Sequence, residues 1–434
     1  MVDLDLTWHW AGILSLVIFA AAYVLVILED ATGMRKSKPV VLAAGLIWGL
    51  IGLAFTQAGQ PEVAHARALQ VIEEYGELFL FLFVVITYVN TLEERRAFEV
   101  LRAALVGRGL SYRQLFLLTG VLAFVLAPVL NNLTTALVMG AVVIALGRDN
   151  PRFVTLACIS VVVACNAGGV FSPFGDITTL MVWQRGKLDF FEFFALFLPS
   201  AVNWLVPAAL MYPAIPLGRP IPHPGRISAK PGMWGVVILL ALTIATAVSF
   251  KNFLSLPPAM GMMLGLGYLQ LWSYWLSLLG KRGQDATMVL DSFAQMERVE
   301  WDTLLFFFGI IFAVGGLGML GYLAIASEGL YIGLGPTSAN VIIGLSSAVI
   351  DNIPLMFAVL TMDPAMSEGQ WLLITLTCGV GGSILSIGSA AGVTLMGLAR
   401  GQYTFFSHLK WAWAVALGYA AAILAHLWLN AALF

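Results

Sequence analysis

Apolar residues run along this chain in long stretches that are separated by short polar segments. A membrane-spanning helix needs about 20 mainly apolar residues. Eight stretches approach or exceed that length without an internal polar cluster: 10–28, 39–56, 75–92, 190–211, 233–250, 256–279, 302–325 and 410–433. The pattern therefore predicts an all-α polytopic membrane protein.

Four further apolar stretches are interrupted by polar or glycine-rich clusters. The stretches 113–147 and 336–362 are broken at Pro128–Asn132 and at Asp351–Pro354, and the stretches 153–184 and 370–400 are broken at Asn166–Asp176 and at Gly379–Gly392. Irregular backbone is tolerated at membrane depth only where protein buries it or where it lines a water-filled cavity. We therefore expect the four breaks to surround a polar site inside the protein.

The distribution of basic residues indicates how each broken stretch meets the membrane, because cytoplasmic loops carry an excess of Lys and Arg. We interpret 113–147 and 336–362 as re-entrant hairpins and 153–184 and 370–400 as broken spanning helices, with the N-terminus outside. Of the 22 basic residues, 18 then lie on the cytoplasmic side, Arg108, Arg148 and Arg226 among them. The prediction is about ten transmembrane helices plus two hairpins.

The two halves of the chain resemble each other in the order of these features. The segment 179–186 matches 394–401 in its Thr-Leu-Met start and Arg-Gly end, and the tip Asn131-Asn132 corresponds to Asp351-Asn352. We expect one repeat in residues 1–211, a cytoplasmic linker at 212–232 and a second repeat in 233–434. Because each repeat has five spans, an odd number, the second is inverted relative to the first. Such inverted repeats are typical of secondary transporters.

Composition excludes several classes of protein. The 434 residues are 60% hydrophobic and only 11% charged, whereas soluble domains carry about a quarter charged residues. The formal net charge of −2 provides no basic surface for nucleic acid. The three cysteines and five histidines show no metal-ligand spacing and no disulfide framework. We therefore expect no cofactor and no catalytic histidine, and we interpret the cysteines as small core residues.

Two acidic residues stand apart from the others because they lie at the centres of breaks. Asp176 and Asp351 occupy related positions in the two halves, and no Lys or Arg lies at comparable depth to neutralise either one. A carboxylate inside the membrane is costly and marks a functional candidate. It must be protonated, solvated or bound to a cation. The alternative is that both residues only cap half-helices.

Neutral oxygen-bearing residues accompany both aspartates. The candidates near the breaks are Thr134, Thr135, Asn166, Ser172, Thr178, Thr179, Ser347, Asn352, Ser386 and Ser389. Hard oxygen ligands of this kind suit Na⁺ or Li⁺ and do not suit soft metals. For Thr134 and Thr135, hydroxyl bonding back to the preceding helical turn is an equally good interpretation.

Two acidic residues near span ends are candidates for an access path to the breaks. Glu94 lies beside Arg95 and Arg96, so a solvated interfacial ion pair is the simpler interpretation. Asp302, followed by Thr303, either caps a helix at the cytoplasmic surface or lines that path.

The motifs resemble those of the ion transporter superfamily, and within it the NhaD-type sodium/proton antiporters. The resemblance is carried by Pro128–Thr135, Phe171–Thr179, Trp301-Asp302-Thr303, Asp351-Asn352-Ile353-Pro354 and the Ser386/Ser389 segment. It implies a homodimer in the bacterial inner membrane with a role in pH homeostasis, in which each protomer has a scaffold and a mobile transport domain that holds both hairpins. The N-terminus placed outside by the basic residues would then be periplasmic. The family's ion-binding pattern falls on Asn131, Asn132, Asp176, Asp351, Asn352, Ser386 and Ser389. Of these, Asn132, Asp176, Asp351 and Asn352 would hold Na⁺, and Asp302 and Thr303 also match functional positions.

The combined interpretation is a secondary transporter that exchanges Na⁺, and also Li⁺, for H⁺ by alternating access. Asp176 and Asp351 would bind H⁺ and the cation in turn. A related carrier of arsenite, citrate or dicarboxylate is one competing interpretation. However, the dicarboxylate-carrying relatives have Ser-Asn-Thr at both tips, where this chain has Asn-Asn-Leu and Asp-Asn-Ile. A passive channel also competes, as does an intramembrane aspartyl protease, whose Gly-x-Gly-Asp signature is absent.

Overall fold

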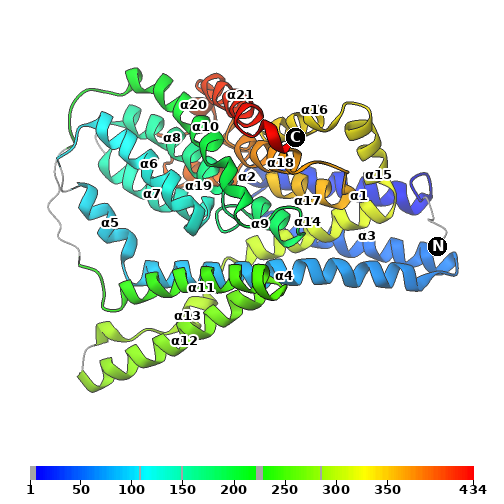
Figure 1. The fold of residues 1–434 in the computed structure, drawn as a ribbon, viewed down its shortest axis with the longest axis horizontal. Helices are drawn as coiled ribbons and strands as arrows, with labels where there is room; N and C mark the ends of the chain where they lie inside the picture. The colour runs from blue at the N-terminus through cyan, green and yellow to red at the C-terminus, as the bar shows by residue number, and fades with distance from the viewer. Residues whose placement is uncertain (1–5, 107–108, 148–149, 221–227, 284–285) are drawn as a thin grey trace.

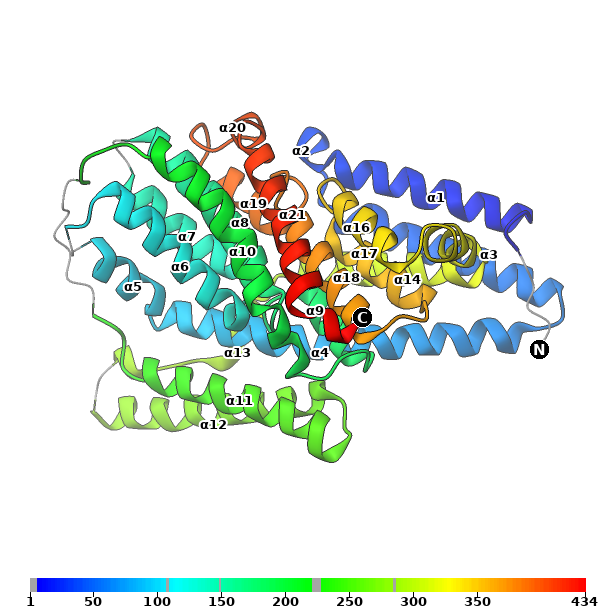
Figure 2. The same cartoon turned by 45° about the horizontal axis from the view of Figure 1, so that its top comes forward.

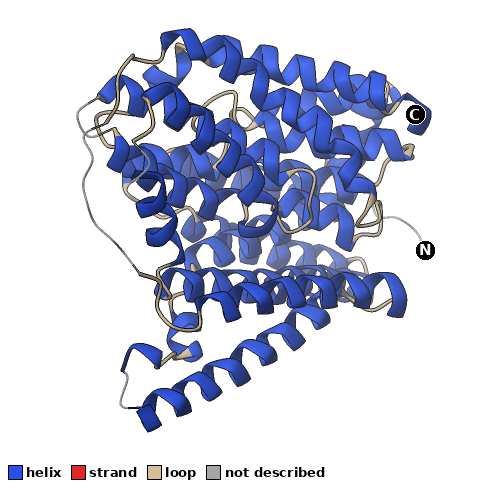
Figure 3. Ribbon diagram, turned by 60° about the vertical axis from the view of Figure 1, so that its left-hand side comes forward, coloured by secondary structure: helices blue, strands red, loops and turns tan. Residues whose placement is uncertain are grey.

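The computed structural model describes residues 6–106, 109–147, 150–220, 228–283 and 286–434. Within these ranges the chain is built from helices and contains no strand (Figure 3). Eight helical segments are long and apolar enough to cross a membrane: Trp10–Ile27, Ser37–Gln57, Tyr112–Leu130, Pro151–Gly169, Glu192–Ala214, Met233–Leu254, Trp301–Met319 and Ala412–Leu429. The prediction of a polytopic all-α membrane protein is confirmed.

Long helices occupy the stretches that the apolar pattern predicts as unbroken. They are α1 (Trp10–Ile27), α3 (Ser37–Gln57), α4 (Pro61–Glu94), α10 (Phe197–Met211), α11 (Met233–Leu254), α12 (Pro258–Gly283), α14 (Trp301–Met319) and α21 (Ala412–Leu429). Two boundaries differ from the prediction. Helix α4 starts far ahead of residue 75 and includes a polar first part. The stretch 302–325 is not continuous, because α14 ends at Met319 and Gly321 adopts a φ of 99° that favours glycine.

The helix breaks lie where the polar clusters interrupt the apolar pattern. The broken stretches form the pairs α6 (Tyr112–Leu130) and α7 (Asn132–Leu146), α8 (Pro151–Gly169) and α9 (Ile177–Gln184), α16 (Pro336–Ser346) and α17 (Asn352–Met362), and α18 (Glu368–Gly381) and α19 (Ala390–Leu398). The re-entrant or spanning character of each pair, and the inverted repeat, stay predictions. So do the domain limits, and Arg108, Arg148, Arg226 and part of the linker 212–232 lie outside the described residues.

Short helices connect the longer ones. They are α2 (Glu29–Thr32), α5 (Ala97–Val106), α13 (Ser292–Glu297), α15 (Tyr322–Ser327) and α20 (Phe405–Leu409), together with η1 (Glu192–Leu196), η2 (Tyr212–Ala214), η3 (Ala286–Met288), η4 (Glu328–Ile332) and η5 (Ala431–Leu433).

A polar side chain caps the second helix at each of the four breaks. Asn131 accepts a hydrogen bond from the backbone N–H of Thr134, and Asp176 accepts one from Thr178. Asp351 and Ser389 cap α17 and α19 in the same manner. The first N–H groups of a helix have no partner within the helix, so these caps satisfy donors that would otherwise be orphaned inside the protein.

The helices pack as two groups that also contact each other, since α17 packs against α14. In one, α3 packs against α1 and α14, and α12 packs against α4 and α11. In the other, the broken helices pack as the pairs α6/α8, α16/α18, α7/α19 and α9/α17, and α10 packs against α21. Figures 1 and 2 both show α11 and α12 side by side along α4, and α10 beside α21. Helices α8 and α18 are buried over nearly their whole length.

Small residues allow the broken helices to approach closely. A side-chain carbon at Gly168 of α8 would overlap the backbone carbonyl of Phe124 in α6, and one at Gly344 of α16 would overlap Thr377 in α18. Contacts of this kind are typical of helix pairs in membranes. Because the clash at Gly168 is with backbone, neighbouring side chains cannot relieve it by moving.

Gly168→Ala is therefore expected to lower the free energy of unfolding by about 1–3 kcal/mol, through overpacking of α6 against α8. The matched control is Gly45→Ala in α3, where an added carbon meets nothing within 4 Å. The thermal unfolding midpoint of each purified variant is measured, with size-exclusion chromatography as the readout of folded protein. Equal midpoints for the two variants would contradict the packing argument.

Candidate functional site

Asp176 lies where the breaks meet, at the first turn of α9, and its side chain is buried. Its Oδ1 accepts hydrogen bonds from the backbone N–H and the hydroxyl of Thr178, at 3.0 and 2.9 Å. Its Oδ2 accepts from Nδ2 of Asn132 at 3.1 Å and from Nδ2 of Asn352 at 3.3 Å. The carboxylate therefore receives donors from α7, α9 and α17, which come from both halves of the chain.

A chain of hydrogen bonds continues from Asp176 to the fourth break. Asn132 also donates to Oδ1 of Asn166 in α8 at 3.2 Å, and Asn166 donates to the hydroxyl oxygen of Ser389 at 3.1 Å. Asn166 and Ser389 are buried. The backbone N–H of Asn132 donates to the carbonyl of Gly175, which ties the first tip to the break that contains Asp176. Polar groups of all four breaks are thereby joined.

Both aspartates face a single cavity of about 730 Å³. Asp351 is half-buried and accepts a hydrogen bond from the backbone N–H of Ile353 at 3.3 Å. Of the residues that the sequence singles out, the cavity is lined by Asn131, Asn132, Thr134, Asp176, Thr303, Asp351, Asn352 and Ser389. Residues far apart in the sequence thus line one cavity that is large enough for many water molecules.

The cavity is also lined by charged residues from segments that we predict to be cytoplasmic. Four are acidic and two are basic: Glu29, Glu93, Glu99, Glu300, Lys36 and Arg102. An acidic excess attracts cations and raises their local concentration. The cavity therefore offers a path for a small cation from that side of the protein to Asp176 and Asp351.

Other candidate ligands lie behind the cavity wall. The Ser347 hydroxyl donates to the carbonyl of Cys378 at 2.9 Å. The hydroxyl oxygens of Thr135, Thr179 and Ser386 are buried, and none has a hydrogen-bond partner among the described residues. All of these hydroxyls have lone pairs free for a ligand, but only that of Ser347 is held in place by a hydrogen bond that it donates. The three cysteines are buried, as predicted.

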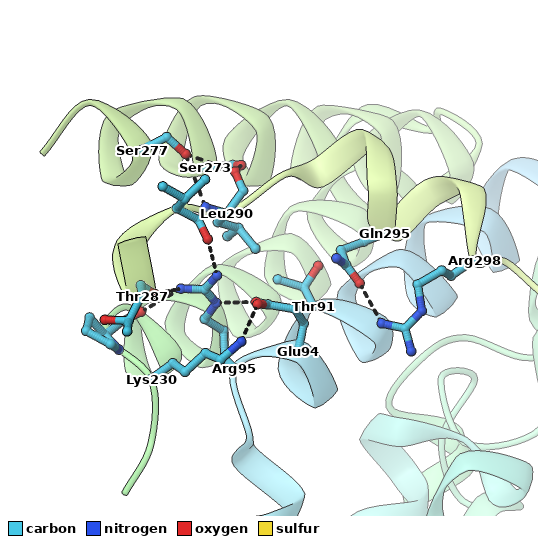
Figure 4. A network of polar contacts seen from close by, with 12 residues as sticks. Thr91, Glu94, Arg95, Lys230, Ser273, Ser277, Thr287, Leu290, Gln295 and Arg298 are labelled. Atoms are coloured by element: carbon cyan, nitrogen blue, oxygen red, sulfur yellow. Dashed lines mark hydrogen bonds and ion pairs between the residues drawn. The ribbon is translucent and has the colours of Figure 1, made fainter. Parts of the chain in front are cut away.

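The two acidic candidates for an access path are engaged elsewhere. Figure 4 shows Glu94 between Arg95 and Lys230, with which it forms ion pairs. Arg95 is fully buried and donates to the carbonyls of Pro231, Thr287 and Val289. This network joins the end of α4 to two distant loops and is more buried than the predicted interfacial pair. Asp302 accepts a hydrogen bond from the hydroxyl of Ser37. Neither Glu94 nor Asp302 lines the large cavity.

His408 is a site-supporting residue that the sequence analysis missed. It is fully buried in α20, donates from Nε2 to the carbonyl of Ser383 at 3.0 Å, and pairs through Nδ1 with the Tyr403 hydroxyl at 2.7 Å. Because a carbonyl only accepts, Nε2 carries a proton, and burial of the ring favours its neutral form. Ser383 lies in the break that also contains Ser386 and Ser389, so His408 anchors one end of that segment.

Comparisons with known proteins show which family the chain belongs to. A family model described as a citrate transporter matches residues 11–379. The Na⁺/H⁺ antiporter NhaD of Alkalimonas amylolytica is 52% identical over 450 residues, which cover 99% of this chain and 93% of that protein. The chain belongs to the NhaD-type sodium/proton antiporters. The resemblance seen in the motifs is confirmed, and so is the expectation of a transporter rather than an enzyme, because these relatives are named as transporters.

Two further relatives show how far the NhaD-type similarity extends. The Na⁺/H⁺ antiporter NhaD of Vibrio parahaemolyticus is 55% identical over 409 residues, covering 90% of this chain and 99% of that protein. Sodium/proton antiporter 1 of Arabidopsis thaliana is 31% identical over 427 residues, covering 94% of this chain and 71% of that protein. The similarity therefore includes both halves of the chain and all four breaks.

His408 of this NhaD-type chain is expected to make stability depend on pH. Burial lowers the pKa of His408, which lies outside the predicted spans, from 6.5 to about 4. Below pH 6.5, His408 binds a proton in the unfolded chain but stays neutral in the folded protein. The free energy of unfolding therefore decreases as the pH falls toward 4. The full effect is about 3 kcal/mol.

The measurement is the unfolding midpoint of the wild type and of His408→Gln from pH 8 to pH 4. The difference between the two proteins should shrink as the pH falls, because glutamine does not titrate. His65→Gln, which removes an exposed histidine from α4, is the control. A difference that stays constant over the whole series would refute the assignment.

Proposed function

We propose that this protein exchanges Na⁺ for H⁺ across a bacterial inner membrane, with Asp176 and Asp351 binding the proton and the cation in turn. The observation that carries the proposal is that two carboxylates from opposite halves of the chain face one cavity. The groups that donate hydrogen bonds to Asp176 are all neutral: two amides, a hydroxyl and a backbone N–H. A buried carboxylate without a cationic partner requires a proton or a bound cation.

Competition for the same oxygens would couple the two ions without a separate proton site. When Asp176 is ionised, the side-chain amides of Asn132 and Asn352 direct their Nδ2 atoms toward it. Na⁺ requires oxygen ligands, so both amides would turn through 180° and present their carbonyl oxygens to the ion. Na⁺ would then be held by Asn132, Asp176, Asp351 and Asn352. Li⁺, which also takes hard oxygen ligands, is expected to replace it.

The surrounding polar residues fit supporting positions in this scheme. Asn166, Thr178 and Ser389 belong to the hydrogen-bond chain around Asp176, and Asn131 and Thr134 form the capped tip beside it. Thr135 and Ser386 supply unpartnered hydroxyls, and Ser347 holds the backbone of the opposite helix. Thr303 lines the path to the predicted cytoplasmic side, whereas Glu94 and Asp302 are engaged in contacts outside it.

Alternating access would move the broken helices relative to the long ones. The packing of α6/α8 corresponds to α16/α18, that of α7/α19 to α17/α9, and that of α4/α12 to α14/α3. These paired contacts support an internal repeat, and the odd number of predicted spans in each half would make it inverted. In this proposal the N-terminus lies on the periplasmic side, and the long helices form the scaffold of a homodimer. The exchange needs no cofactor, because the family transports Na⁺ and H⁺ as free ions.

A carrier of citrate or another carboxylate is the second candidate, favoured by the description of the matching family model. The charges of the cavity argue against it. Its lining contains two aspartates at the breaks and four glutamates, and its basic members Lys36 and Arg102 come from the predicted cytoplasmic segments. An anion would meet like charge along that path.

Asp176→Asn and Asp351→Asn should each reduce exchange to the level of vesicles without the protein, because a neutral amide neither releases a proton nor balances the charge of Na⁺. The assay adds NaCl or LiCl to inverted vesicles and follows the internal pH with a fluorescent dye. Asp189→Asn, on the segment after α9, is the control and should retain exchange. Normal exchange in Asp351→Asn, or pH changes driven by citrate in the wild type, would overturn the proposal.

A further inference from the structure

A second pocket, of about 240 Å³, lies at the other end of the helices that border the large cavity. It is lined by Gln70, Glu73, Glu74, Glu77, Leu78, Met181, Gln184, Arg185, Ile311, Phe357 and Leu360. These residues come from α4, α9, α14 and α17, except that Arg185 directly follows α9. We predict from the basic residues that this side is periplasmic.

The same four helices line both spaces, in succession along their length. On α4 the small pocket ends at Leu78 and the large cavity begins at Leu82. On α9 the large cavity takes Asp176 and Ile177, and the small pocket takes Met181. Helices α14 and α17 repeat this order, with Phe307 followed by Ile311 and Ile353 followed by Phe357. The two spaces are therefore successive parts of one line through the protein.

The layer between the two spaces is thin and apolar. On each helix the two linings lie about one turn apart, and one helical turn is about 5 Å long. On α4 this layer contains Leu78 and Phe81, both buried, and the ring of Phe81 packs on Phe174 with 5.2 Å between centroids. An ion at Asp176 thus reaches the predicted cytoplasmic side through a wide cavity. About one turn of packed side chains separates it from the other side.

An ion pair in the small pocket joins a broken helix to a long one. Arg185, at the end of α9, pairs with Glu74 of α4, and both side chains are largely buried. Gln70 donates to the second oxygen of Glu74 at 3.2 Å, which holds the carboxylate in place. Asp176 directly precedes α9 and Arg185 directly follows it, so the helix next to the proposed ion site is tied to a long helix at its far end.

Two further contacts fasten the same end of α9. Lys251 of α11 donates to the carbonyl of Gln184 at 3.3 Å, where a cation also meets the negative end of the helix dipole. Lys187 pairs with Asp363, which ends α17. Of these three contacts, those through Arg185 and Lys251 join the broken helices to the long ones. The pair of Glu74 with Arg185 is the one that lies in the pocket itself.

We infer that the small pocket is the closed far half of the ion route, and that the Glu74–Arg185 pair is a latch that keeps it closed while the large cavity is open. The inference rests on the proposed function as a carrier. Opening the far side requires α9 to move away from α4, and the pair opposes that movement. Loss of the pair should shift the protein toward the conformation in which the small pocket is open.

The test measures access to the pocket directly. Met181→Cys places a thiol in the pocket, and a membrane-impermeant maleimide is added to vesicles from the predicted periplasmic side. Leu360→Cys on α17 is a second reporter if Met181→Cys does not fold. The native cysteines are fully buried, so the parent protein gives the background. With the latch intact, labelling should be slow.

Glu74→Gln and Arg185→Gln should each raise the labelling rate by about tenfold, a typical size for coupling between two conformations. The exchanged pair Glu74→Arg with Arg185→Glu should restore slow labelling. Glu73→Gln is the matched control, because it removes a carboxylate from the same pocket and leaves the pair intact. Equal labelling of all variants, or an equal rise in Glu73→Gln, would overturn the latch.

This readout is separate from transport. If labelling follows the latch but no Na⁺/H⁺ exchange occurs, the proposed function fails and the two-sided route stands. If exchange is normal and the labelling rate is the same with and without the Glu74–Arg185 pair, the proposed function stands and the latch is wrong.

Discussion

The buried carboxylate of Asp176 is the constraint on which the rest of the arrangement depends. A charge in a low-dielectric interior is expensive unless hydrogen bonds and a counter-charge compensate it. Here the hydrogen bonds come from Asn132, Asn352 and Thr178, and the described residues that bond to it supply no positive charge. In the proposed function, this carboxylate would be balanced by a small cation or a proton, which is the property that an exchanger requires.

That site exists because four helices are interrupted at one place. Each interruption leaves backbone N–H groups without partners, and a capping side chain satisfies some of them. Asp176 and Asp351 both cap a helix and face the cavity. The two interpretations of these residues, as caps and as ion ligands, are therefore compatible. The cap fixes the position of the carboxylate, and the oxygen not used by the cap remains available to other partners.

Local sequence was sufficient to predict the breaks, because proline, asparagine and glycine clusters within apolar stretches report directly on helix geometry. It was not sufficient for the polar start of α4, where hydropathy falls although Pro61 stands at the first helical position and Gln70 pairs with Glu74 one turn away. Nor did it show that Gly321 divides the stretch 302–325, since an isolated glycine within an apolar run is compatible with a continuous helix.

Long-range contacts explain the other differences. Glu94, Arg95 and Arg96 are consecutive charged residues, and local sequence does not show which of them is buried. Of the three, only Arg95 is buried, because the loops at 231 and 287–289 bring carbonyl groups to it. His408 gains its role from Ser383, which is 25 residues away. Glu94 pairs with Arg95, whereas the neighbouring Glu93 lines the cavity. This difference likewise depends on how the end of α4 is oriented. None of these contacts has a local signature.

The size of the large cavity has a consequence for how often the site is occupied. One cation in 730 Å³ corresponds to a local concentration of about 2 M. In a solution of about 20 mM Na⁺, an uncharged cavity of this size would contain an ion about 1% of the time. The negative charge of the glutamates in its lining should raise the local Na⁺ concentration and therefore this occupancy. Their effect should weaken as salt screens them. In the proposed function, the apparent affinity for Na⁺ would therefore depend on the whole cavity and the surrounding solution as well as on the two aspartates.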